Sequence, residues 1–252
     1  MRLEGAAALV TGAGTRIGQA IAIGLAQAGC DVAIHYHGSA RGAEETARQV
    51  REAGASERGG RAGRRAALLQ ADLTDAARAR SLADEAARAL QRLDIVVNSA
   101  AIMVRERVED VTPESWNATL DLNLRAMFFV SQGAIPHLRR ARGKIINIAD
   151  LAGLEPWPVY IPHSVSKAGV VMLTKALARA LAPDIAVNAV APGAVLLPED
   201  GDPQTRDHIR DTTPLARLGS PADVVAAVRF LLEGTDYATG TVLVIDGGRL
   251  IR

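Results

Sequence analysis

Short apolar segments recur along this chain of 252 residues, and a helix-forming stretch follows each of them. Segments of this length without regular polar alternation are typical of strands buried on both faces of a parallel sheet. The alternation predicts about seven strands with right-handed crossovers, helices on both faces, and a ligand crevice at the carboxyl ends of the strands. We therefore expect a doubly wound, Rossmann-like α/β fold in a single domain, residues 1–252. The expected strands are residues 6–10, 31–35, 66–71, 94–97, 145–150, 185–190 and 241–245.

The composition argues against several kinds of partner. The 29 Lys and Arg residues nearly balance the 28 Asp and Glu residues, so neither nucleic acid nor an anionic membrane is expected. Cys30, the only cysteine, rules out an internal disulfide, and its apolar context favours a packed thiol in a reducing compartment. No apolar run reaches the roughly 18 residues of a membrane span, and the first residues lack a signal-peptide pattern. We expect a soluble, cytoplasmic protein with a small-molecule substrate and no metal.

A glycine-rich turn follows the first expected strand. Residues 11–18 read TGAGTRIG, and an amphipathic helix is expected over residues 17–28. Backbone N–H groups in such a turn can approach a diphosphate at the helix N-terminus. Its position after the first strand of a repeating β/α pattern predicts a dinucleotide site.

The second expected strand indicates which dinucleotide is bound. Sites that prefer NAD usually have an acidic residue near the end of this strand, bonded to the ribose 2′-hydroxyl. Residues 35–39 read HYHGS and contain no acid, while Arg16 stands in the middle of the glycine-rich turn. A guanidinium there could reach a 2′-phosphate, so the sequence favours NADPH. His35 and His37 are either part of this site or solvated ends of the loop.

A second group of polar residues is expected at the fifth strand and the helix after it. Asp150 ends the strand, and His163 and Lys167 are four residues apart, so they share one helix face. Hydride transfer to a C=O or C=N carbon leaves negative charge developing on the oxygen or nitrogen, and a nearby acid lowers that barrier. An imidazole suits this work because it ordinarily titrates near neutral pH.

Two irregular segments and one long helix complete the expected organisation. Residues 54–65 are rich in Gly and Arg and are expected to form a surface loop, with contact to a cofactor phosphate as the alternative. Residues 194–217 contain three prolines and are expected to form a lid over the substrate. A helix over residues 113–140 contains Asn123, whose side chain must find a partner if it is buried.

Several of these motifs, in this order, resemble the short-chain dehydrogenase/reductase family over essentially the whole chain. The matching pieces are residues 11–18, Asp72-Leu73, Asn98-Ser99-Ala100, Asn123, the strand before Asp150, Lys167, Pro192-Gly193 and Asp246-Gly247-Gly248. The resemblance implies a single NAD(P)-binding domain that commonly assembles as a homotetramer. It implies cofactor contacts from Gly12, Thr15, Arg16, Ile17, Gly18, Tyr36, His37, Ser39, Asp72, Leu73, Asn98, Ser99, Ala100, Lys167, Pro192, Gly193 and Val195.

Within that family the chain is most similar to the pteridine reductases and their bacterial relatives. Arg16 takes the place of the middle glycine, residues 35–37 and Ser39 resemble the stretch after the second strand, and Asp150 takes the place of the usual catalytic serine. Gly38 departs from the arginine that those enzymes often have. The resemblance implies reduction of a dihydropterin or another cyclic C=N substrate by NADPH, with Asp150 assisting protonation of the ring.

The larger departure is His163, which stands where the family has a tyrosine proton donor, four residues before Lys167. Either His163 donates the proton, or Asp150 is the only donor and His163 positions the substrate, or the change has disabled the chemistry. By resemblance, Lys167 holds the nicotinamide ribose and Asn123 anchors a water that links Lys167 to bulk solvent.

Two aromatic residues and two alternative functions remain open. Trp157 and Tyr160 either stack on a planar substrate or only pack. The first alternative function is an NADP(H)-dependent carbonyl reductase or alcohol dehydrogenase with His163 as the acid. The second is an NADP(H)-binding protein without catalysis.

Overall fold

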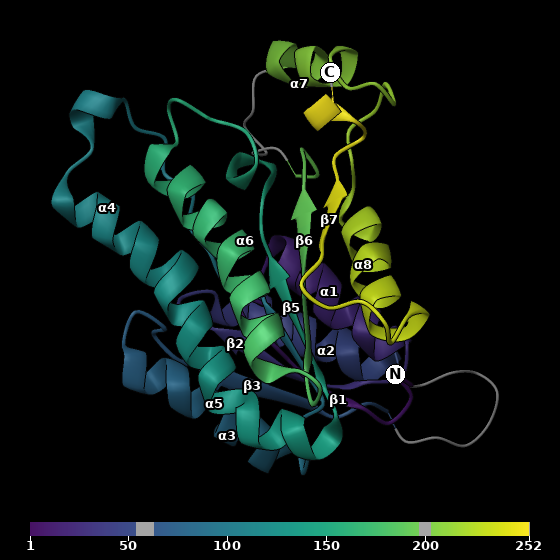
Figure 1. Ribbon diagram of the computed structural model, residues 1–252. Helices are drawn as coiled ribbons and strands as arrows, with labels where there is room; N and C mark the ends of the chain where they lie inside the picture. Colours follow the sequence, from purple (N-terminus) through teal and green to yellow (C-terminus); the bar gives the residue numbers. More distant parts are fainter. Residues whose placement is uncertain (54–62, 197–202, 252) are drawn as a thin grey trace.

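The structure is a computed structural model that describes residues 1–53, 63–196 and 203–251. Its seven strands form one parallel sheet in the order β3-β2-β1-β4-β5-β6-β7, with helices on both faces (Figure 1). This confirms the expected doubly wound fold. The strands are β1 (Ala7–Val10), β2 (Asp31–Tyr36), β3 (Ala66–Gln70), β4 (Ile95–Asn98), β5 (Lys144–Ile148), β6 (Ala186–Pro192) and β7 (Val242–Ile245). The helices are α1 (Arg16–Gln27), α2 (Ala40–Ala53), α3 (Ala76–Leu90), α4 (Pro113–Leu120), α5 (Ala126–Ala141), α6 (Ile161–Leu181), α7 (Pro203–Asp211) and α8 (Pro221–Arg229).

The central strand β1 shows why buried strands read as unbroken apolar runs. Ala8 and Val10 face a core built with α1, α2 and α8, whereas Ala7 and Leu9 face a second core built with α3, α5 and α6. All four side chains are fully buried. Because successive side chains point to opposite faces of a sheet, both sets of side chains in β1 are in the core, and the strand has no polar residue.

The sheet creates a crevice between β1 and β4. The chain proceeds from β1 to β2 and β3 on one side, and then returns to place β4 on the other side of β1. Connections leave these two strands in opposite directions, which opens a space at their carboxyl ends. The glycine-rich turn after β1 and the segment after β4 both lie at this edge.

The expected helix over residues 113–140 is interrupted by a π-helical segment. α4 and α5 are joined by Asp121–Arg125, which has π-helical hydrogen bonding. A π segment accommodates one extra residue in a helix and is frequent at functional sites. Asn123 lies within it and is fully buried. The prediction of one uninterrupted α-helix over residues 113–140 is therefore wrong at Asn123, the residue for which the sequence had suggested a buried role.

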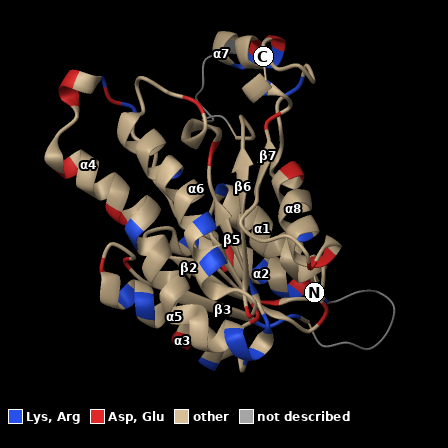
Figure 2. Ribbon diagram, in the orientation of Figure 1, with Lys and Arg blue, Asp and Glu red and all other residues tan. Residues whose placement is uncertain are grey.

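Positive and negative side chains are mixed over the molecule (Figure 2), as the balanced composition predicts. Among the parts of the chain that the structure describes, no helix combines the length and apolar character that crossing a membrane requires.

Candidate active site

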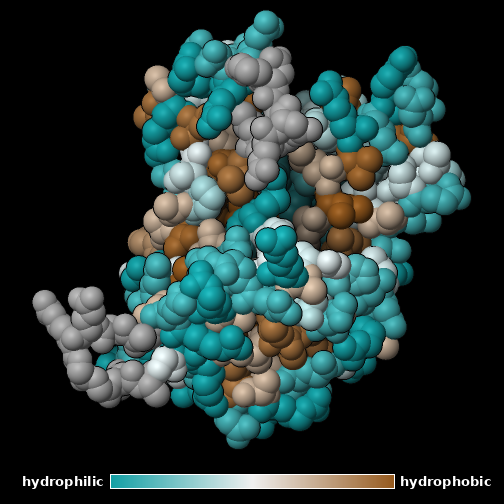
Figure 3. All heavy atoms as spheres, turned by 180° about the vertical axis from the view of Figure 1, so that it is seen from behind, coloured by the Kyte–Doolittle hydropathy of each residue, from teal (hydrophilic) through white to brown (hydrophobic). Residues whose placement is uncertain are grey.

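A cavity of about 1200 Å³ runs along the carboxyl ends of the strands. It opens on the back of the molecule, where Figure 3 shows a hollow with hydrophobic side chains on its walls. Every residue predicted for the cofactor, the substrate or the chemistry lines this cavity except Asn98 and Asn123. Those two asparagines are buried behind it. Residues from seven separate segments of the sequence therefore meet at one site.

The glycine-rich turn is shaped to admit an anion. Gly12 has a φ of +65°, and a Cβ there would lie 2.8 Å from the Cα of Ala100. Only glycine fits that conformation and that close approach without strain. Helix α1 begins at Arg16, and the preceding Thr15 gives its first turn no side-chain cap. Since an uncapped helix N-terminus presents free N–H groups and positive potential, this end of the cavity fits a cofactor diphosphate.

His35 holds the glycine-rich turn against the rest of the sheet. The Gly12 N–H donates to His35 Nδ1 at 3.1 Å, while His35 Nε2 lies 3.1 Å from the Ala71 carbonyl oxygen. A carbonyl only accepts, so Nε2 carries the hydrogen and the ring is neutral. Burial lowers the pKa of His35 to about 4. The interpretation of His35 as a solvated loop end is therefore wrong, whereas His37 is exposed.

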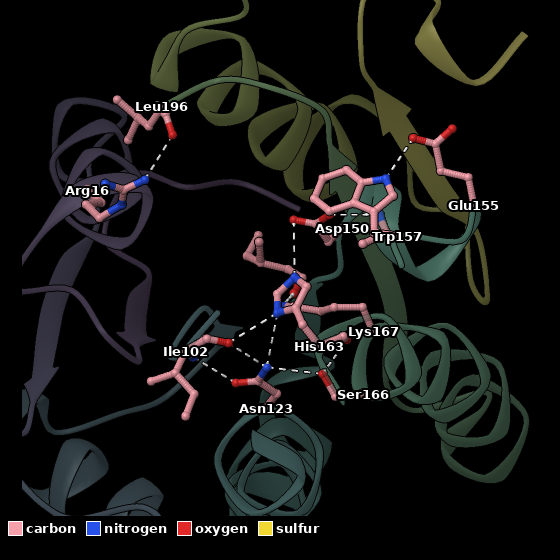
Figure 4. Close-up of polar contacts among 12 residues, drawn as sticks. Arg16, Ile102, Asn123, Asp150, Glu155, Trp157, His163, Ser166, Lys167 and Leu196 are labelled. Atoms are coloured by element: carbon pink, nitrogen blue, oxygen red, sulfur yellow. Dashed lines mark hydrogen bonds and ion pairs between the residues drawn. The ribbon is translucent and has the colours of Figure 1, made fainter. Parts of the chain in front are cut away.

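The end of the cavity near β2 contains a cation and several hydrogen-bonding groups. The Arg16 guanidinium donates to the Leu196 carbonyl at 3.0 Å across the cavity (Figure 4). Asp72 accepts hydrogen bonds from the side chain and the backbone N–H of Thr74, and these bonds lower the pKa of its carboxyl. His37 also faces this end, and its charge is a weaker cause of the same shift.

Asp150 and His163 face each other at the opposite end, close to the substrate side of the cavity (Figure 4). The Ala152 N–H donates to Asp150 Oδ1 at 2.8 Å, which fixes the carboxylate at the start of a short 3-10 turn. His163 lies in the first turn of α6 and is 4% exposed. Its Nε2 is 3.8 Å from Asp150 Oδ2 and is buried without a hydrogen-bond partner among the described residues. The pair is therefore close without being hydrogen-bonded.

Lys167 lies one helical turn beyond His163 and is buried. Its Nζ donates to the Ile148 carbonyl at 2.8 Å, at the end of β5. Burial lowers the pKa of Lys167 to about 8, and the charge of Asp150 opposes this shift. An ammonium so placed adds positive potential to the middle of the cavity.

Asn123 fixes the wall behind His163. Its Oδ1 accepts from the Ile102 N–H at 2.8 Å, and its Nδ2 donates to the Ile102 carbonyl at 2.9 Å and to Ser166 Oγ at 3.1 Å. The Ser166 hydroxyl in turn donates to the His163 carbonyl at 2.7 Å. Ser166 and the Ile102 main chain thus support the site, and no motif in the sequence singled them out.

Asn98 is likewise a supporting residue. Its Nδ2 donates to Asn147 Oδ1 at 2.9 Å and to Ser131 Oγ at 3.0 Å. The side chain predicted to contact the cofactor therefore joins β4 to β5 and α5 beneath the cavity.

The wall beyond Asp150 is aromatic. The rings of Trp157 and Tyr160 meet edge to face with centroids 5.9 Å apart, and the Trp157 indole N–H donates to Glu155 at 2.9 Å. In the predicted lid, residues 197–202 fall outside the described part of the chain, and α7 contributes Thr205 and Ile209 to the cavity. Residues 54–62 of the predicted Gly- and Arg-rich loop also fall outside it.

The doubly wound sheet, the uncapped helix at a glycine-rich turn, and the buried lysine beside a histidine and an aspartate define a dinucleotide-dependent oxidoreductase. A family described as "Enoyl-(Acyl carrier protein) reductase" matches residues 12–249. The chain belongs to the short-chain dehydrogenase/reductase family, and it is an NAD(P)-dependent oxidoreductase of that type.

Relatives with assigned names share almost the full length of the chain. It is 36% identical to 3beta-hydroxysteroid dehydrogenase 1 of Eggerthella lenta, over 98% of this chain and 94% of that protein. It is 35% identical to 2-dehydro-3-deoxy-D-gluconate 5-dehydrogenase of Escherichia coli, over 99% and 97% of the two proteins. A solved structure of a blue fluorescent protein from a metagenomic library, in complex with NADPH, has a TM-score of 0.89 and 30% identity, and 99% of each chain is covered.

Proposed function

We propose that this protein is an NADPH-dependent carbonyl reductase that interconverts a ketone and a secondary alcohol. The observation that carries the proposal is His163 Nε2, which is buried without a hydrogen-bond partner among the described residues, on a side chain that lines the same cavity as the glycine-rich turn. A group that can exchange a proton there is what reduction of a carbonyl needs besides a hydride. The names of the two dehydrogenases above, both of which imply carbonyl or alcohol chemistry, support this reading over a pterin substrate.

The residues present fit NADPH. The N-terminus of α1 would hold the diphosphate, and Arg16 would pair with the 2′-phosphate, because no carboxylate follows β2 to bind a free 2′-hydroxyl. Lys167 would bind the nicotinamide ribose. When bound, NADPH supplies a hydride to the substrate carbon. A structure of a relative in complex with NADPH supports this choice.

The chemistry in this proposal uses His163, Asp150 and Lys167, with Asn123 as a supporting residue. Lys167 keeps the substrate side of the cavity positive, which favours negative charge developing on the carbonyl oxygen. Asn123 holds the Ile102 segment against the His163 ring. Trp157 and Tyr160 form the wall against which the substrate would pack.

A dihydropterin is the second candidate substrate. It is favoured by Asp150, whose carboxylate lies beside the aromatic wall of Trp157 (Figure 4), where a planar ring could pack with its C=N nitrogen near the acid. A homotetramer and a cytoplasmic location stay predictions from family resemblance.

The proposal is tested by following NADPH and NADH oxidation with three matched substrate sets: ketones, cyclic imines and dihydropterins. Cofactor binding is measured in a separate experiment, by the quenching of Trp fluorescence. We expect ketone reduction that is faster with NADPH. Reduction of dihydropterin alone would favour the second candidate, and tight NADPH binding without turnover on any substrate would identify a binding protein instead.

A further inference from the structure

We propose that His163 Nε2 is the atom that passes the proton to and from the substrate, and that Asp150 acts through its charge rather than as the donor. This inference rests on the proposed carbonyl reduction and specifies its proton path. It is carried by the two sides of the His163 ring, which have different surroundings.

One ring nitrogen is committed to the protein backbone. His163 Nδ1 lies 3.1 Å from the Ile102 carbonyl oxygen. Because that oxygen can only accept, the hydrogen of the ring sits on Nδ1. Asn123 Nδ2 also lies 3.4 Å from Nδ1, but its two hydrogens have shorter contacts to the Ile102 carbonyl and to Ser166 Oγ. Nδ1 therefore keeps its hydrogen in both charge states of the ring.

The other ring nitrogen has different surroundings. Nε2 is buried without a partner among the described residues and faces the Asp150 carboxylate at 3.8 Å. A bare lone pair facing a carboxylate is unfavourable, whereas an N–H⁺ facing it is favoured. The gap is longer than a hydrogen bond, so Asp150 does not use the hydrogen-bonding position of Nε2, and the His163 side chain lines the cavity in which a substrate would bind.

Asp150 is better placed to hold charge than to donate a proton. Its Oδ1 already accepts the Ala152 N–H at 2.8 Å, so this oxygen serves as an acceptor and has no hydrogen to donate there. Lys167, one turn later on α6, is a second charged group near the ring. Asn123 and the Ile102 main chain, which face the ring from the remaining sides, are uncharged. The Asp150 carboxylate thus attracts a positive charge on the imidazole, whereas the Lys167 ammonium repels it.

NADPH, when bound, would supply the hydride: the C–H bond broken at its nicotinamide ring would leave NADP⁺ and would become the new C–H bond of the substrate, while the π-electron pair of the carbonyl would move onto its oxygen. The oxygen takes the proton as the Nε2–H bond breaks, which leaves a neutral imidazole with its hydrogen on Nδ1. Solvent then returns a proton to Nε2. In alcohol oxidation the same nitrogen accepts the hydroxyl proton.

The first test needs no turnover. In protein with ¹⁵N-labelled histidine, long-range ¹H–¹⁵N NMR distinguishes the two neutral tautomers, and His163→Gln assigns the signal. We expect the neutral His163 ring to carry hydrogen on Nδ1, while His35 in the same sample carries it on Nε2 because of its contacts with Gly12 and Ala71. A neutral His163 with hydrogen on Nε2 would overturn the inference.

The second test is the pH dependence of ketone reduction. We expect the rate to fall as the pH rises and His163 loses its proton. Asp150→Asn keeps the shape of the side chain and removes its charge, so this fall should move to lower pH. His163→Tyr should move it to higher pH, and His163→Gln should lower kcat by about 100-fold or more while NADPH still binds. His137→Gln, at a surface pair with Asp84, is the control and should change nothing.

The two proposals fail in different ways. If the wild-type protein reduces no carbonyl substrate, the proposed function fails, and the NMR measurement still decides the tautomer. If the wild-type protein reduces ketones and neither Asp150→Asn nor His163→Tyr moves the pH profile, the function stands and the proton path through Nε2 is wrong.

Discussion

We expect acid to lower the free energy of unfolding through His35, a residue that takes no part in the proposed chemistry. Its ring is 2% exposed, and both nitrogens are used: Nδ1 accepts from Gly12, and Nε2 donates to Ala71. A second proton would remove the acceptor for the Gly12 N–H and would place a charge in the core. Burial therefore lowers the pKa of His35 from 6.5 to about 4.

The sign and size of the effect follow from linkage. Between these two pKa values the unfolded chain binds a proton that the folded chain does not, so the free energy of unfolding falls as the pH falls. The contribution is fully present above about pH 6.5 and is lost progressively down to pH 4. It amounts to about 3 kcal/mol in all, of which about 2 kcal/mol disappears between pH 7.5 and pH 5.

Urea unfolding without cofactor, at fixed protein concentration and several pH values, measures this loss. His35→Gln keeps a donor toward Ala71 but cannot titrate, so its stability should be lower at neutral pH and should lack this part of the pH dependence. His37→Gln, two residues away and exposed, is the matched control and should behave as the wild type. Equal acid sensitivity in the wild type and His35→Gln would refute the reasoning.

Three other predictions concern the binding of NADPH. Arg16→Ala should weaken NADPH binding roughly 10- to 100-fold, as loss of a charge-assisted hydrogen bond predicts, and should affect NADH little; equal losses would remove Arg16 from the 2′-phosphate site. Because the pKa of Lys167 is lowered to about 8, its positive charge disappears as the pH rises through 8, so NADPH affinity should decline between about pH 7 and pH 9.5. Lys167→Met should bind more weakly with a flat profile, and a decline that persists in this variant would point to another group. Gly12→Ala should lower the free energy of unfolding by about 1–3 kcal/mol and impair NADPH binding, whereas Gly38→Ala, with open space around its Cα, should do neither in thermal unfolding and titration.

The sheet could be predicted because its evidence is local. Strands covered on both faces are mainly apolar, and segments such as Ala7–Val10 and Ile95–Asn98 are buried along their whole length. The start of α3 has a similarly local cause, because the Asp75 side chain accepts from the N–H groups of Ala77 and Arg78. The π segment was not predicted, because one extra residue in a long helix leaves its hydrophobic pattern almost unchanged.

The composition of the site could be predicted, but its internal geometry could not. Motifs at strand ends converge because parallel strands end at one edge, which places Asp150 and Lys167 in one cavity with the glycine-rich turn. The roles of the histidines depend on partners far away in the sequence. His35 is buried by contacts with Gly12 and Ala71, and His163 is oriented by Ile102. Residue type and spacing do not reveal such pairings.

The π segment between α4 and α5 allows the packing of the long helix in the core and the direction of the Asn123 side chain to change independently. Deleting a residue elsewhere in α5 would rotate everything after it by about 100° and turn Val130 and Ala134 away from the core that they share with α3. Deleting one residue within Asp121–Arg125 would instead leave a regular α-helix whose two halves keep their present phase. The expected outcome is a folded protein in which the side chains of this segment, Asn123 among them, point in new directions. Length variation at this turn can therefore alter the wall behind His163 while the scaffold stays intact.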